Sequence, residues 1–97
     1  MHHSTDRAEW RVILENHDIL DRLAEVEPGW ATTPEVQFCV APGDPRERAR
    51  ARRVLVALAK LDAIDTIDAR HQGEPMAVYL VDPERIRKLL DEIEAGR

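Results

Sequence analysis

Five arginines within eight positions are the residues of this chain whose type and spacing most clearly suggest chemistry. They are Arg46, Arg48, Arg50, Arg52 and Arg53; Lys60 follows seven residues later, and Glu47 is the one acid between positions 46 and 60. A guanidinium group can donate paired hydrogen bonds to a guanine edge or to phosphate oxygens. The spacing therefore predicts contact with a polyanion. The alternative is a solvated helix face whose arginines pair with acids of the same chain.

The charge of the chain is unevenly distributed around this cluster. The 97 residues carry a net charge of −5, from 14 basic and 19 acidic residues. Nine acids and three arginines lie in residues 1–45, and nine acids and five bases lie in residues 61–97. A local cluster decides where a polyanion docks, whereas net charge mainly sets solubility and non-specific association. A basic segment between two acidic flanks is therefore compatible with an acidic polymer as partner.

The histidines and the single cysteine give weaker signals. His2 and His3 could bind copper or nickel with the amino terminus, but the four histidines and Cys39 lack the spacing of a zinc site. His17 is expected to be a partly buried core residue, and Cys39 a small buried hydrophobe. The four glycines are scattered and form no phosphate-binding loop. We therefore expect that the protein is not an enzyme and uses no metal or cofactor.

Length and composition indicate one small globular domain. Hydrophobic residues make up 43% of the chain and charged residues 34%, a balance typical of folded proteins. No apolar run approaches the roughly 18 residues of a membrane-spanning helix, and the first residues do not resemble a secretory signal. One cysteine cannot form an internal disulfide. We expect a disordered segment over residues 1–5 and a single cytoplasmic domain over residues 6–97.

Residues 6–26 show helical periodicity. Their two apolar stripes are slightly out of phase, so either one helix or a helix broken near Asn16 is expected. Trp10 lies on the first stripe and is expected in the core. Trp30 follows a Pro-Gly turn and is expected to pack over this helical region.

A short helix is predicted over residues 33–40. Thr33 would cap it, and Pro34 suits the first helical position. Its inward side would consist of Val36, Cys39 and Val40. A strand is the alternative, because every second residue from Val36 to Val40 is apolar.

The clearest helix start directly precedes the arginines. Asp44 can cap the helix, Pro45 suits its first turn, and Glu47 stands three residues after the cap. The helix is expected to reach about Leu61. Its apolar stripe would be Ala51, Val54, Leu55, Leu58 and Leu61.

Two strands and a last helix complete the chain. Residues 64–69 and 76–81 are rich in strand-forming residues, and the loop 70–75 between them contains the glycine that a hairpin turn needs. Asp82 and Pro83 begin a helix expected to end at about residue 95, before Gly96.

This order of elements resembles the winged helix-turn-helix family over roughly residues 16–81. The segments that carry the resemblance are Ile19-Leu20-Asp21-Arg22-Leu23 in the first helix, Thr33-Pro34-Glu35-Val36 at the second, Leu55 to Ile64 at the end of the third, and Gly73-Glu74-Pro75 with Val78-Tyr79-Leu80 in the wing. The resemblance implies a mainly α fold with a small β-hairpin: three helices, a two-stranded wing and an extra C-terminal helix.

The resemblance also implies a function. In this family the third helix enters the major groove of double-stranded DNA. The implied contacts of the helix are Arg46, Arg48, Ala49, Arg50, Arg52, Arg53 and Lys60, with Ala49 permitting close approach. The amides near Thr33 would hold a phosphate, and the wing would contribute Arg70, His71 and Gln72. We therefore expect a small, nucleoid-associated transcriptional regulator that reads DNA sequence.

The sequence allows two roles for the last helix. Ile86, Leu89, Leu90 and Ile93 could cover the core of their own domain, or could form half of a two-fold helix pair. We favour the pair, because a homodimer would match a palindromic DNA site. Two other functions remain open: a winged-helix module that binds proteins and not DNA, and an accessory protein that dimerises with a DNA-binding protein.

Overall fold

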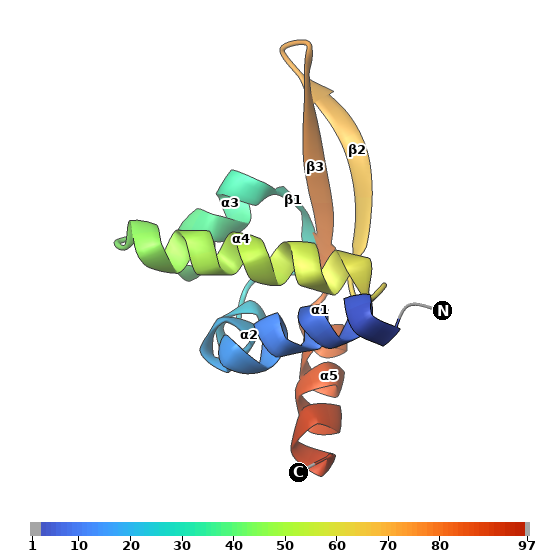
Figure 1. Cartoon of the computed structure of the whole chain (residues 1–97). Helices are drawn as coiled ribbons and strands as arrows, with labels where there is room; N and C mark the ends of the chain where they lie inside the picture. The colour runs from blue at the N-terminus through green and yellow to red at the C-terminus, as the bar shows by residue number, and fades with distance from the viewer. Residues whose placement is uncertain (1–2, 97) are drawn as a thin grey trace.

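The computed structural model describes residues 3–96, and the side chains of residues 7–70 and 72–96. The chain folds into five helices and a small three-stranded antiparallel sheet (Figure 1). The predicted class, mainly α with a small β-hairpin, is confirmed at this coarse level. No helix in residues 3–96 combines the length and the apolar character needed to cross a membrane.

The first helical region is broken, as one of the two alternatives predicted. Helix α1 spans His3–Glu15 and α2 spans His17–Leu23, with non-helical backbone at Asn16 (φ −123°, ψ 38°). Asn16 is buried, and its Nδ2 donates a hydrogen bond to the Val12 carbonyl at 2.7 Å. Residues 3–5 belong to α1, so the expected disordered segment is wrong for them, while residues 1–2 lie outside the described range.

A short strand that we did not predict precedes the second helical region. Strand β1 spans Gly29–Thr32 and pairs antiparallel with the last strand. Trp30 lies on this strand and is 51% exposed, so its expected packing over the first helices is wrong. Trp30 is the register partner of Leu80 on the last strand, so the two side chains lie on the same face of the sheet.

Helix α3 spans Thr33–Val40, which settles the choice between helix and strand. Its cap is Thr32, one residue before the cap predicted. The Thr32 hydroxyl accepts a hydrogen bond from the Glu35 amide at 3.3 Å, and the Glu35 carboxylate accepts one from the Thr32 amide at 2.8 Å. Cys39 is exposed, contrary to the expectation, because this short helix buries only the Val36 and Val40 side.

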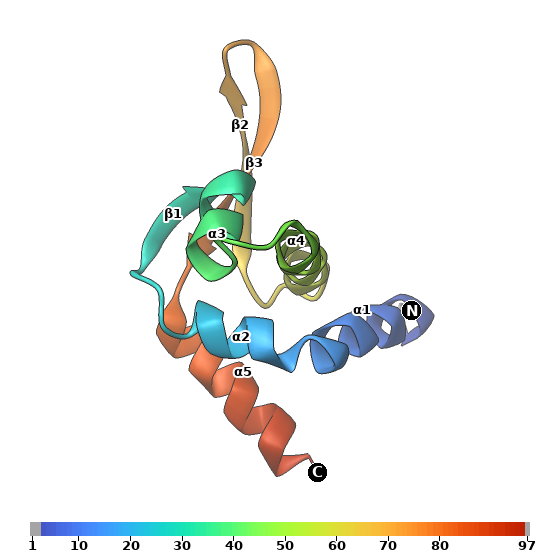
Figure 2. The same ribbon diagram turned by 90° about the vertical axis from the view of Figure 1, so that its left-hand side faces the viewer.

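Helix α4 spans Pro45–Lys60 and lies at the centre of the helical layer, packed against α1 and α3 (Figures 1 and 2). Asp44 caps it as predicted by accepting a hydrogen bond from the Arg46 amide at 2.8 Å. The buried stripe contains Ala51, Val54, Leu55, Ala57 and Leu58. Leu61 is half-buried at the end of the helix, and Asp62 turns the chain toward the sheet with a positive φ of 56°.

The remaining strands form a longer hairpin than predicted. Strand β2 spans Asp65–His71 and β3 spans Glu74–Val81, and the sheet order is β1-β3-β2. Gln72 (φ 53°) and Gly73 (φ 82°) alone form the turn, and two positive φ values are the signature of a type I′ hairpin. The hairpin projects beyond the helices in both views (Figures 1 and 2).

Helix α5 spans Pro83–Ala95, as predicted, and Asp82 caps it with hydrogen bonds from the Glu84 and Arg85 amides. Its apolar stripe lies in the core of its own domain. The exposed fractions are 1% for Ile86 and 8% each for Leu89 and Ile93, and Leu90 packs partly against the same core. Of the two roles that the sequence left open for this stripe, covering the core of its own domain is therefore the one that the structure shows.

Candidate nucleic-acid interface

The exposed side of α4 carries mostly basic residues. From Arg46 to the end of the helix, the exposed residues are Arg46, Ala49, Arg52, Arg53, Val56 and Lys60, which we term the α4 basic face. Their spacing of three or four residues places them on one side of the helix, opposite the buried stripe. This face carries four positive charges and no acid.

Packing of α4 explains why these side chains point outward. The buried stripe is held against α1 and α3, which leaves the opposite side of α4 exposed. Ala49 and Val56 have short side chains, so the middle of the face projects less far from the helix axis than the arginines do. A helix whose exposed face combines short side chains with basic ones has the size and charge that fit the major groove of DNA.

Arg52 and Arg53 are exposed and form no ion pair with another described residue. They border a shallow hollow of about 290 Å³ between α1 and α4, together with Glu9, Val12 and Val56. Lys60 lies at the other end of the face, where its Nζ is 3.7 Å from the Glu9 carboxylate. Of the four bases on the face, Lys60 is therefore the one that pairs with an acid among the described residues.

Arg48 points away from this face. Its Nη1 donates hydrogen bonds to the carbonyls of Ala41 (3.1 Å) and Pro42 (3.0 Å), and its guanidinium carbon lies 4.7 Å from the centre of the exposed Phe38 ring. These contacts fix the turn between α3 and α4. We assign Arg48 to this turn and not to the contact surface.

Arg50 is also engaged within the chain. Its Nε donates to the Asn16 side-chain oxygen at 2.7 Å, and its Nη2 forms an ion pair with Asp18. Burial opposes ionisation of Asp18, but the hydrogen bond and charge of Arg50 outweigh it and hold the Asp18 pKa below the usual aspartate value. For Arg50, therefore, the self-paired alternative describes the structure better than a groove contact.

The one acid of the arginine segment is neutralised by a residue that sequence reasoning did not connect with it. Glu47 accepts hydrogen bonds from the Arg22 guanidinium at 2.8 and 3.3 Å, and Arg22 also donates to the Val40 carbonyl at 3.0 Å. The Glu47 carboxylate raises the pKa of Arg22, so this pair stays charged. Arg22 lies 25 positions from Glu47, and no spacing rule pairs residues so far apart.

The phosphate site expected at Thr33 is not favoured by the local charges. The first amides of α3 lie beside the Glu35 carboxylate, which accepts the Thr32 amide hydrogen bond. That hydrogen bond holds the Glu35 pKa below its usual value, so a negative charge already occupies this helix end. A phosphate would meet that charge, and we leave Thr33 out of the candidate interface.

The wing offers one basic side chain near its tip. Arg70 is exposed, and its Nη1 donates to the Gly73 carbonyl at 2.9 Å. Gln72 is exposed in the turn, whereas the His71 side chain lies outside the described part of the chain. Asp68 and Glu74 are also exposed on the hairpin, so the wing is not a continuous basic surface.

The remaining candidate groups are the histidines. The half-buried His17 lies 3.4 Å from Asp21 and 3.6 Å from Glu94, between α2 and α5. His2 lies outside the described range, and so does the side chain of His3. Among the described residues, no group of three or more histidines, cysteines or acids is arranged to hold a metal ion.

Comparisons of the chain with protein-family models, with curated proteins and with solved structures give no match. The resemblance to winged helix-turn-helix proteins therefore remains a prediction from the order of elements.

Proposed function

We propose that the protein binds double-stranded DNA in a sequence-specific way and regulates transcription at the nucleoid. The observation that carries the proposal is the α4 basic face, which has four bases and no acid on the one exposed side of a 16-residue helix. An α-helix fits the major groove, where arginines can pair with guanine edges or hold phosphates.

The roles of the basic residues follow from their surroundings. Arg46, Arg52 and Arg53 form no hydrogen bond through their guanidinium groups with described residues, so we assign them to bases and phosphates. Ala49 and Val56 would meet the groove floor, where small apolar side chains can contact thymine methyl groups. Arg70 would contact the backbone from the wing. Arg48 and Arg50 would act only by holding α4 in place.

The test is DNA binding over a salt series with labelled duplexes from a random-sequence selection. We expect wild-type protein to select a defined sequence, and R52A/R53A to bind it at least about tenfold more weakly. The slope of log K against log salt is negative, and each lost phosphate contact should reduce its magnitude by about 0.9. The matched control is K88A, which removes an exposed base on α5 and should leave affinity and slope unchanged.

Two results would contradict this function: no binding by wild-type protein at low salt, or equal loss in R52A/R53A and K88A. A protein-binding module is the second candidate, favoured by the net charge of −5 and by the exposed acids Asp68 and Glu74 on the wing. In that case R52E/R53E would abolish capture of an acidic protein partner while wild-type protein still failed to bind DNA.

A further inference from the structure

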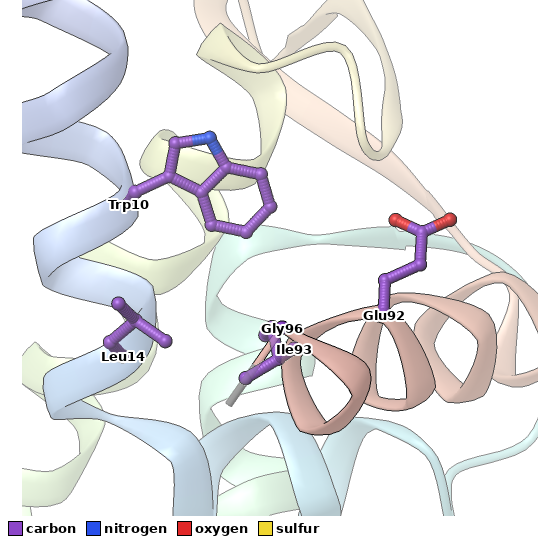
Figure 3. A pocket seen from close by; sticks show the side chains of 5 residues that line it. All are labelled: Trp10, Leu14, Glu92, Ile93 and Gly96. Carbon is purple, nitrogen blue, oxygen red and sulfur yellow. The ribbon is translucent and has the colours of Figure 1, made fainter.

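A groove lies between α1 and α5, away from the α4 basic face. Trp10, Leu14, Glu92, Ile93 and Gly96 line it, and its volume is about 490 Å³ (Figure 3). Trp10 and Leu14 point into it from α1, and Ile93 borders it from the last turns of α5. Leu14 is 46% exposed, so its apolar side chain is accessible from the groove.

Helix α1 has a second amphipathic side that faces this groove. Ile13 and Asn16 are buried on the side that meets the rest of the domain. Arg7, Trp10, Arg11 and Leu14 follow the spacing i, i+3, i+4 and i+7 and therefore share one side of α1. Arg7 and Arg11 are exposed and form no ion pair with another described residue. This side of α1 presents two apolar anchors, Trp10 and Leu14, and two positive charges.

The α5 side of the groove has the opposite charge. Glu92 lines the groove and is exposed, and Gly96 marks the end of α5, where the last carbonyls carry the negative end of the helix dipole. Figure 2 shows α1 and α5 diverging from α2 toward their outer ends. One wall is therefore apolar and basic, and the other apolar and acidic.

We propose that a second copy of this chain fills the groove, so that the protein is a two-fold homodimer with α1 of each chain against α5 of its partner. A two-fold contact requires a patch that is complementary to itself. The basic side of α1 and the acidic end of α5 meet this requirement, and Trp10 and Leu14 are apolar anchors at i and i+4, a spacing with which a helix can fill an apolar groove.

This interface does not rest on the proposed DNA binding, because no groove residue belongs to the α4 basic face. It would join two such faces into one molecule, as a palindromic site requires. This interface differs from the helix pair expected from the sequence. Its contacts come from the exposed side of α1, and Ile93 is the one residue of the expected α5 stripe that lines the groove.

Sedimentation velocity on the full chain across the micromolar range tests this interface. We expect wild-type protein to reach twice the chain mass of 11.1 kDa, and L14E to raise the dimer dissociation constant at least about tenfold. The control is I67E, which places the same charge at a similarly exposed apolar residue (52% against 46%) and should leave the dimer intact. Circular dichroism would verify that both variants are folded.

A charge exchange makes the test independent of folding. R11E and E92R should each weaken the dimer, and R11E/E92R should bind more tightly than either single variant. The proposal is overturned if wild-type protein keeps the mass of one chain, if I67E dissociates the dimer while L14E does not, or if the double variant recovers nothing. Binding of L14E to a half-site duplex would separate loss of the dimer from loss of DNA binding.

Discussion

At the scale of single residues, Asn16 connects three elements of the domain. Its buried amide donates to the Val12 carbonyl in α1 and accepts from Arg50 of α4, both at 2.7 Å, at the point where α1 and α2 separate. Arg50 in turn pairs with Asp18 at the start of α2. The position of α4 relative to the first two helices therefore depends on a polar group inside an otherwise apolar core.

We predict that N16A lowers the free energy of unfolding by about 1–3 kcal/mol, because it leaves the partly buried Val12 carbonyl and the Arg50 Nε without their Asn16 partner. Urea unfolding measures the change. The control is E25A, which alters an exposed residue in the loop after α2 and should change stability by less than about 0.5 kcal/mol. An equal effect in both variants would contradict this role of Asn16.

A second residue-scale prediction concerns pH. The Thr32 amide donates to Glu35 and lowers its pKa, so the ionised form is favoured in the folded state. This stabilisation is present above the unfolded pKa of about 4.3 and is lost as pH falls through the lower folded pKa. Between about pH 5 and pH 3, the Tm of wild-type protein should therefore fall more steeply than that of E35Q. Parallel Tm curves would exclude this contribution.

At the scale of elements, local signals in the sequence were sufficient where the cap and the stripe agree. Asp44 with Pro45 and Asp82 with Pro83 placed the starts of α4 and α5, and the strong apolar spacing placed their buried sides. The break at Asn16 and the helical state of residues 33–40 were both among the alternatives that the pattern allowed.

Strand β1 could not be predicted in the same way. Its four residues, Gly29–Thr32, have little strand periodicity of their own, and they become a strand through pairing with β3, almost fifty positions later. The same limit applies to the candidate site. The sequence predicted a basic helix, but which arginines stay exposed depends on Asn16, Asp18 and the Ala41 and Pro42 carbonyls, which meet them only in the folded domain.

The wing turn provides a prediction at this scale. Gly73 has a φ of 82°, in the left-handed region where other residues are strained, and nothing lies within 4 Å of an added Cβ. G73A should therefore lower the free energy of unfolding by about 1–2 kcal/mol through backbone strain alone. G43A is the control, since Gly43 is equally open but does not have a positive φ in that region. Chemical denaturation compares the two, and an equal loss would contradict the assigned strain.

At the scale of the whole molecule, the charge distribution decides how a polyanion can approach. A net charge of −5 repels DNA from most orientations, whereas the α4 basic face offers one side with four bases, of which only Lys60 pairs with an acid, Glu9, among the described residues. Such a molecule would bind non-specific DNA weakly and would depend on correct docking of α4. The projecting wing, with Arg70 near its tip and acids along its strands, would limit the orientations further.

Titration of ¹⁵N-labelled protein with its selected duplex, followed by amide chemical shifts, tests the central claim most directly. We predict that the largest shift changes map to the exposed side of α4, at Arg46, Ala49, Arg52, Arg53 and Val56, with a smaller group at the wing turn. An unchanged spectrum at low salt, or changes concentrated on α5 and the outer side of the sheet, would contradict DNA recognition by this helix.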